Sequence, residues 1–323
     1  MTSTSPIRPG PRLPPGQQLG QVTAVAATAD GEIYVLHRGT PPVLCFDRDG
    51  QFLRAWGDTD ILAGGGHFLR IDPEDHPWVA DTSRHQVLKF DREGVLLAAL
   101  GRRHQAGDAP DQFDQPTDLA FLPSGDFFVS DGYGNARIKK YTADCELITM
   151  WGRRGRLPGE FDTPHTLCLD TSGTLYISDR GNSRIQVYAP DGRFLAEWRA
   201  FPPVDGLACA ADGSLFAATG RANGFVRLST IEFEGNGEGR EPIVLESAGN
   251  GYCTYRELVG HVVPPAGQFN MIHGIAVDAN GDVYVAEVRA RRAQKLIRRR
   301  PFRAQQQLAR ASRPGNRDEQ EER

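Results

Sequence analysis

Residues 161–198 read as four short strands in a row, and the same unit returns along the chain. The strands are TLCLD, TLYISD, RIQVYA and FLAEW, and Ser-Gly, Gly-Asn-Ser and Asp-Gly separate them. These residues favour turns because they adopt positive φ or cap a turn with a side chain. A four-stranded antiparallel sheet of this size cannot bury both faces alone, so its copies must stack on one another.

Six copies of this unit follow from aligning the turn between its first two strands. These turns are Asp30-Gly31, Glu74-Asp75, Ser124-Gly125, Ser172-Gly173, Asp212-Gly213 and Asn280-Gly281. The spacing is roughly 40 to 50 residues, apart from a last interval of about 68, and this is the period of propeller blades. We therefore predict an all-β fold, a six-bladed β-propeller, with the extra length between Glu232 and Gln268 as a loop.

The repeats place the propeller at residues 18–297. Residues 1–17 are rich in Pro and Gly and read as a flexible arm, and residues 298–323 read as a charged tail that is disordered or a solvated helix. The sixth copy lacks a recognisable fourth strand. In a closed ring that strand would come from the N-terminal region, near Gln17 to Gln21.

Composition excludes several classes of function. The net charge of −4 gives no general attraction to nucleic acid or anionic membrane, so neither is expected as a partner. The first residues lack the apolar run of a signal peptide and no later segment could span a bilayer, which makes the cytoplasm the expected location. The five cysteines form no CxxC pair and indicate neither a disulfide framework nor a zinc ribbon, and several fall on strand positions and read as packing residues; the five are Cys45, Cys145, Cys168, Cys209 and Cys253.

One residue of each copy is expected to face the central channel. These residues lie about eight positions before each turn, at the start of the innermost strand. They are Thr23, His67, Thr117, His165, Asp205 and His273.

Histidine thus occupies alternate copies at one offset. In a six-bladed ring, three such imidazoles are related by rotations of about 120° and converge on the axis. Three histidines with a free fourth position are typical of a catalytic zinc site, so His67, His165 and His273 are the predicted metal ligands. Any one of them alone would read as an ordinary histidine in a turn.

A second set of residues is expected to surround the metal, because the end of the second strand lies at the same face as the start of the first. These residues are Arg38, Thr82, Tyr133, Arg180, Arg221 and Arg289. Tyr133 lies between two glycines, which leaves its hydroxyl accessible, and Arg38 and Arg180 supply cations suited to a carboxylate. Arg221 and Arg289 read as surface charges, and a structural role in turns is expected for Asp81, Asp131 and Asp179.

The motifs FDQPTDLAF, FVSDGYGNARI, LPGEFDTPHTLCLD and SDRGNSRIQVY resemble those of NHL-repeat six-bladed propellers. More narrowly, the chain resembles the peptidyl-α-hydroxyglycine α-amidating lyases over about Leu19 to Ile297. The resemblance implies a zinc held by His67, His165 and His273, a catalytic Tyr133, and substrate-binding Arg38 and Arg180. The implied reaction splits a carbinolamide substrate, a small α-hydroxy amide or peptide, into a primary amide and glyoxylate.

The chain departs from that family at three places. Gly274 stands where the family has an aspartate that serves a structural calcium, which counts against calcium here. Gly134 replaces the cysteine that secreted animal enzymes carry after the tyrosine, and the proline before His67 is missing.

Three functions therefore remain open. The first is the lyase, or a relative acting on another α-hydroxy amide. The second is a non-catalytic NHL scaffold that binds a protein or RNA partner. The third is a calcium-dependent lactonase-type propeller, for which the channel positions offer only Asp205 as an acidic ligand.

Overall fold

The computed structural model describes residues 7–8, 11–58, 60, 62, 64–199, 202–219, 227–234, 241–248 and 269–297. Regular structure within these ranges is β-strand, apart from one 3-10 turn, η1 (Arg180–Asn182). No helical segment of the described ranges has the length and apolar character that a bilayer crossing requires. The tail at 298–323, Arg221 and Cys253 lie outside the described residues.

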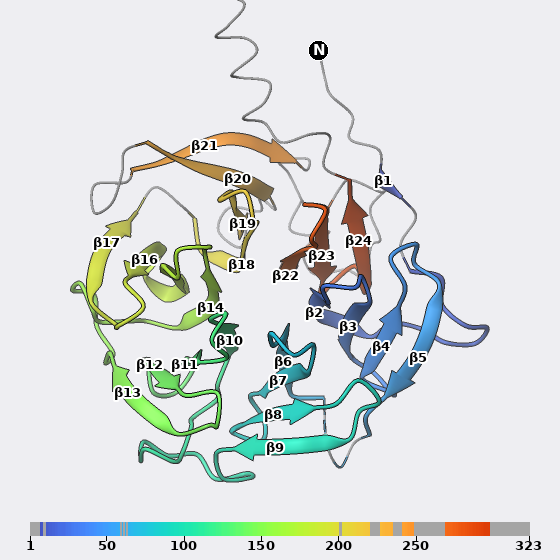
Figure 1. Ribbon diagram of the computed structural model, residues 1–323, viewed down its shortest axis with the longest axis horizontal. Coiled ribbons are helices and arrows are strands. Elements are labelled where there is room, and N and C mark those ends of the chain that lie inside the picture. The colour runs from blue at the N-terminus through green and yellow to red at the C-terminus, as the bar shows by residue number, and fades with distance from the viewer. Residues whose placement is uncertain are drawn as a thin grey trace, which may run out of the picture.

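The strands form six four-stranded antiparallel sheets arranged as a ring (Figure 1). The first sheet contains β2 (Gln21–Ala27), β3 (Ile33–Arg38), β4 (Val43–Phe46) and β5 (Phe52–Trp56). The second contains β6 (Gly66–Ile71), β7 (Pro77–Asp81), β8 (Gln86–Phe90) and β9 (Leu96–Leu100). The third contains β10 (Asp118–Phe121), β11 (Phe127–Asp131), β12 (Arg137–Tyr141) and β13 (Leu147–Trp151).

The other three sheets continue the ring. The fourth contains β14 (Pro164–Leu169), β15 (Leu175–Asp179), β16 (Arg184–Tyr188) and β17 (Phe194–Trp198). The fifth contains β18 (Val204–Cys209), β19 (Leu215–Thr219), β20 (Arg227–Glu234) and β21 (Glu241–Ala248). The sixth contains β22 (Ile272–Val277), β23 (Val283–Glu287), β24 (Arg292–Leu296) and β1 (Ile7–Arg8). The expected all-β propeller is confirmed.

Two details of the expected chain path need correction. The strand that completes the sixth sheet is β1, within the Pro-rich arm, and not the segment near Gln17 to Gln21; Gln21 instead begins β2. The segment expected as a loop after Glu232 contains β21, which pairs with β20 as the fourth strand of its sheet. Both errors have one cause, since an edge strand needs little apolar alternation and leaves a weak signal in the sequence.

Among the described residues, the hydrophobic core forms six clusters, each lying between two neighbouring sheets. Strand β7 shows how one sheet serves two clusters. Val79 packs toward the first sheet, whereas Trp78 and Ala80 pack toward the third. Successive strand residues point to opposite faces, so each sheet buries both of its faces only within the closed ring.

The six turns used for the alignment have a common backbone geometry. Five contain a glycine at positive φ, and the second places Asp75 at φ 64° in the equivalent position. Asp, like Gly and Asn, tolerates this left-handed region, which explains why Glu74-Asp75 replaces a glycine-containing turn.

Candidate metal centre

The residues predicted to face the channel are the extra residues of β-bulges in five of the six inner strands. The pairing with the second strand skips one residue at each of these positions. The skipped residues are Thr23, His67, His165, Asp205 and His273. Thr117, the sixth, lies just before β10 begins. A bulge re-aims a side chain out of the regular alternation along the strand.

The three histidines meet at the centre of the ring. Their ring centroids lie 4.8, 4.6 and 4.9 Å apart, and the ring planes cross at 84°, 79° and 78°. One ligand nitrogen from each falls within 4.8 Å of the other two, and all three side chains are buried. The predicted convergence of His67, His165 and His273 is therefore present in the structure.

The remaining nitrogen of each imidazole contacts a backbone carbonyl of an intervening sheet. His67 Nδ1 lies 2.9 Å from Thr117 O, His165 Nδ1 lies 2.9 Å from Asp205 O, and His273 Nδ1 lies 2.8 Å from Thr23 O. A carbonyl can only accept a hydrogen bond, so Nδ1 carries the proton and a neutral ring keeps its lone pair on Nε2. This arrangement orients and polarises imidazole ligands in known metal sites.

An apolar floor and a buried cation lie beneath the histidines. The ring of Phe68 is 5.2 Å from His67, 5.7 Å from His165 and 5.0 Å from His273. The guanidinium of Arg70, two residues further along β6, lies 5.2 Å from the Phe68 ring. Phe68 therefore separates the histidines from the charge of Arg70.

Arg70 connects the inner strands of five sheets along the axis. It makes two hydrogen bonds to the Asp118 carboxylate, at 2.8 and 2.6 Å. It also donates to Thr166 Oγ1 and to three backbone carbonyls; these are Leu167 O, Leu207 O and Ile275 O, at 3.2 to 3.4 Å. Asp118 is buried, and the Arg70 side chain is 15% exposed. The Arg70–Asp118 ion pair therefore links these inner strands inside the ring, beneath the three histidines.

Tyr133 lies directly against the histidines. Its hydroxyl is 2.9 Å from His67 Nε2, and its ring centroid is 5.2 Å from that of His67 and 5.9 Å from that of His165. Both flanking glycines are required by close contacts. A Cβ at Gly132 would lie 2.2 Å from Pro164 O, and one at Gly134 would lie 2.0 Å from the Asp114 carboxyl carbon. The sequence GYG is thus what allows the tyrosine to reach the axis.

Arg180 lies on the other side of Tyr133. Its guanidinium is 5.4 Å from the centre of the tyrosine ring, and Nη1 donates to Asp205 Oδ1 at 3.2 Å. Asp205 therefore has two contacts at the site, because its backbone carbonyl also accepts from His165. A positive charge held beside the phenol in this way is positioned to receive an anionic group.

The other residues expected around the metal are less well placed. Arg38 is exposed and donates to Gln21 Oε1 at 3.0 Å, and no hydrogen bond, ion pair or ring contact among the described residues joins it to the histidines or Tyr133. Thr82 donates to Gly65 O at the rim. In the sixth sheet Val288, rather than Arg289, occupies the position that Arg180 has in the fourth sheet. The backbone N–H of Val288 and that of Arg180 each donate to the carbonyl of the residue two positions before the channel-facing histidine of the same sheet.

The recurring aspartates have the structural role expected of them. Asp131 Oδ1 accepts from the backbone N–H of Asp114, and its Oδ2 accepts from Asn135 and Arg137. Asp179 makes the same set of bonds one sheet further on, and Asp81 accepts from the turn after β7. Burial raises the pKa of Asp131 and Asp179, and these bonds offset it only in part. These carboxylates shape the turns that carry Tyr133 and Arg180.

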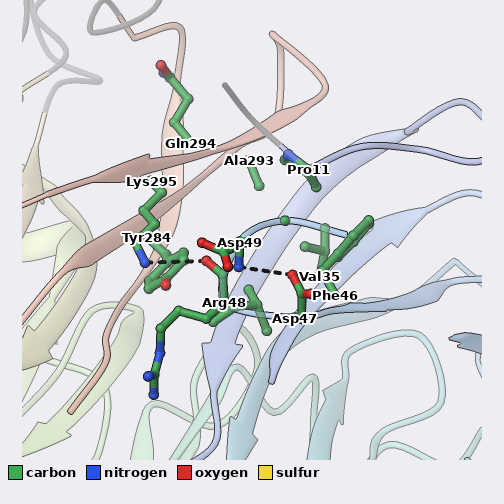
Figure 2. Close-up of a pocket in the computed structure, with 12 residues that line it drawn as sticks. Pro11, Val35, Phe46, Asp47, Arg48, Asp49, Tyr284, Ala293, Gln294 and Lys295 are labelled. Carbon is green, nitrogen blue, oxygen red and sulfur yellow. Dashed lines mark hydrogen bonds between the residues drawn. The ribbon is translucent and has the colours of Figure 1, made fainter. Parts of the chain in front are cut away.

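Two other features lie apart from the histidine group. Asp72, Glu74 and His76 cluster at a turn, but the Asp72 carboxylate is engaged by Trp78 Nε1, by backbone N–H groups and by Lys89. A cavity of about 40 Å³ lies at the seam between the first and sixth sheets, near Val35, Phe46 and Tyr284 (Figure 2). It has room for a few water molecules, and the histidines do not line it.

Sequence reasoning named the channel positions but missed several roles within them. Thr23, Thr117 and Asp205 were identified by register, and the structure adds that their carbonyls orient the histidines. Phe68 and Arg70 were not identified. The available signal was the sequence HFLR after a turn, but a regular strand would place His67 and Phe68 on opposite faces, and only the bulge brings both to the axis.

Comparison with known proteins gives relatives of two kinds. The NHL repeat model matches residues 113–141 and 161–188. NHL repeat-containing protein 3 of Homo sapiens is 31% identical over 283 residues, which cover 83% of this chain and 76% of that protein. Peptidyl-alpha-hydroxyglycine alpha-amidating lyase 1 of Drosophila melanogaster is 31% identical over 332 residues, which cover 87% of this chain and 58% of that protein.

The amidating relatives are longer proteins. Peptidylglycine alpha-amidating monooxygenase of Rattus norvegicus is 30% identical over 83% of this chain but only 29% of its own length, so this chain spans less than two thirds of these amidating relatives. Among solved structures, a streptogramin B lyase superposes with a TM-score of 0.60 at 15% identity, covering 87% of this chain and 95% of that one. That likeness concerns the fold alone.

Proposed function

Since this chain belongs to the NHL-repeat family, we propose that it is a zinc-dependent lyase of the peptidyl-α-hydroxyglycine type. It would cleave an α-hydroxyglycine substrate to a primary amide and glyoxylate, or act on another α-hydroxy amide. The observation that carries the proposal is the meeting of three oriented imidazoles beside the Tyr133 hydroxyl. The similarity to an amidating lyase over 87% of the chain supports this choice of reaction.

The histidine group fits a zinc ion. Each imidazole has its Nδ1 proton held by a carbonyl, so Nε2 is the nitrogen that would coordinate a metal, and three neutral nitrogens leave a fourth position for substrate. Bound zinc would supply Lewis-acid polarisation of the substrate hydroxyl or carboxylate. Calcium is left out of the proposal, because a Cβ at Gly274 would lie 2.8 Å from Thr23 O and the expected aspartate has no space there.

Tyr133 is the proposed base. In its deprotonated, phenolate form it would take the proton from the substrate hydroxyl while the carbon–oxygen double bond forms and the carbon–nitrogen bond breaks. The electron pair of the broken bond passes to the amide nitrogen, which takes up a proton to complete the primary amide. Arg180 would bind the carboxylate that leaves as glyoxylate, and Arg38 would assist from the rim if it turns away from Gln21.

Metal analysis of purified protein, followed by a glyoxylate assay with an α-hydroxyglycine peptide, tests the proposal. We expect zinc in a one-to-one ratio with the wild-type chain and glyoxylate release. His165→Ala should lose both, since it removes a ligand from a three-histidine set. His104→Ala is the matched control, because His104 is exposed and outside the histidine group, and it should change neither.

The opposite result would favour a different function. Wild-type protein that carries almost no zinc, with properties that His165→Ala does not alter, would support the non-catalytic scaffold that binds a macromolecular partner. The similarity to NHL repeat-containing protein 3, over 76% of that protein, leaves the scaffold function open as the second candidate.

Arg180→Gln is expected to raise KM by roughly tenfold to a hundredfold with a smaller effect on kcat, because it removes a charge-assisted hydrogen bond to the substrate carboxylate. Substrate saturation curves with the glyoxylate readout measure this split. The single variant leaves the Asp205 carboxylate, whose side chain is 3% exposed, without its ion-pair partner. The Arg180→Gln, Asp205→Asn double variant controls for that effect. The role of Arg180 is wrong if the double variant restores the wild-type KM.

A further inference from the structure

Two cysteines meet on the inner strands of neighbouring sheets. Cys168 is in β14 and Cys209 is in β18, and their Sγ atoms lie 2.9 Å apart. Both are free thiols. Neither takes part in the histidine group or in the proposed reaction.

The backbone sets this approach. Leu207 N donates to Thr166 Oγ1 at 3.3 Å, and these two residues are separated by 41 positions, as are the two cysteines. Strands β14 and β18 are therefore aligned at one offset over this stretch. A disulfide needs its two β-carbons close and facing one another, and two strands held in register bring the sulfurs together without a change in the chain path.

The surroundings of the pair are mostly apolar but not closed. Cys168 is 7% exposed and belongs to the cluster between the fourth and fifth sheets, and Cys209 packs against that cluster while remaining partly exposed. Burial raises the pKa of the Cys209 thiol well above its usual value, so its reaction with oxidants is expected to be slow. Because Cys209 is partly exposed, a small oxidant molecule can reach the pair.

We propose that Cys168 and Cys209 form a reversible intramolecular disulfide when the protein meets hydrogen peroxide. The Cys209 thiolate attacks one peroxide oxygen, the oxygen–oxygen bond breaks, and Cys209 becomes a sulfenic acid as hydroxide leaves and is protonated. Cys168 then attacks the sulfenic sulfur, the sulfur–sulfur bond forms, and a second water departs with the Cys168 proton. Two thiols are oxidised and one peroxide is reduced to water.

The cross-link would join the two sheets that carry His165 and Arg180 on one side and Asp205 on the other. It closes a loop between residues 41 positions apart, which restricts the unfolded chain. We expect the oxidised protein to unfold at a higher temperature than the reduced protein, by roughly 5 °C or more.

Peptide mapping of the full chain tests the proposal. Reduced protein is treated with hydrogen peroxide, remaining thiols are alkylated, and the chain is digested with trypsin without reduction. The expected product joins residues 157–180 to residues 200–221, with a mass two hydrogens below the sum of the two peptides, and dithiothreitol separates them. The oxidised chain should also lose two of its five cysteine thiols.

Variants provide the controls. Cys168→Ser and Cys209→Ser should abolish both the linked peptide and the rise in Tm, whereas Cys145→Ser, at a cysteine with no sulfur partner among the described residues, should change neither. Recovery of both wild-type peptides in alkylated form after peroxide treatment would overturn the proposal. So would a product with sulfinic acid at either cysteine and no linked peptide. These readouts do not involve zinc or lyase activity, so the inference stands or falls apart from the proposed function.

Discussion

Tyr133→Phe is expected to keep the wild-type zinc content and to lose turnover by roughly 10²-fold or more, the size expected for removing a general base. The substitution removes only the hydroxyl, which lies 2.9 Å from His67 Nε2. The ring contacts with His67, His165 and Arg180 remain, so the histidine group keeps its packing. Steady-state glyoxylate release and metal content, measured on the same preparation, check both halves of the prediction.

Tyr188→Phe is the matched control for this substitution. Its hydroxyl also makes a hydrogen bond, to Gln186 Oε1 at 3.1 Å, but it lies in the core between the third and fourth sheets. The Tyr188→Phe variant should lose a little stability and no activity. Full activity in Tyr133→Phe would refute the role of Tyr133 as base, and loss of zinc in that variant would show that the hydroxyl serves the metal site rather than proton transfer.

Arg70→Met is expected to lower the free energy of unfolding by about 3–5 kcal/mol, because it leaves the buried Asp118 carboxylate without its cation. It also removes the donor shared by Thr166 Oγ1 and the carbonyls of Leu167, Leu207 and Ile275. Urea unfolding measures the loss. The Arg70→Met, Asp118→Leu double variant should recover much of it, since replacing both partners of a buried pair with apolar groups is often neutral.

An exposed pair of the same chemistry provides the comparison. Arg102 and Asp111 are in contact at 2.7 Å, with side chains 54% and 60% exposed. Arg102→Met should cost less than about 1 kcal/mol, because water already solvates and screens both charges. Equal losses from Arg70→Met and Arg102→Met would contradict the internal role of Arg70.

The repeated sheets and the histidine group were predictable from local features. Turn residues mark each copy, apolar runs mark most of the strands, and counting back from the turns reached His67, His165 and His273 without any knowledge of their contacts. The same count forward from the turns reached Tyr133 and Arg180. Copies of one unit in a ring share a register, so equal offsets along the chain become equal heights along the axis.

The strand that completes the ring was not predictable in this way. β1 is only Ile7–Arg8, and it pairs with β24 almost 290 residues later in the chain. A two-residue edge strand has no periodicity to detect, and its identity depends on which segment returns to the open edge of the sixth sheet. Local pattern reasoning therefore placed it about ten residues too late.

Local chemistry in the chain was enough to specify strands, turns and the common height of the imidazoles, because these depend on side chains within a few residues of one another. Contacts between distant segments required the folded ring. They include the bulges that turn both His67 and Phe68 to the axis, the carbonyls that set each imidazole tautomer, the pairing of Arg70 with Asp118, and the approach of Cys168 to Cys209. The bulges belong to the pairing of strands within one sheet, whereas the other contacts depend on how one sheet packs against the next, which is a property of the closed ring rather than of any single repeat.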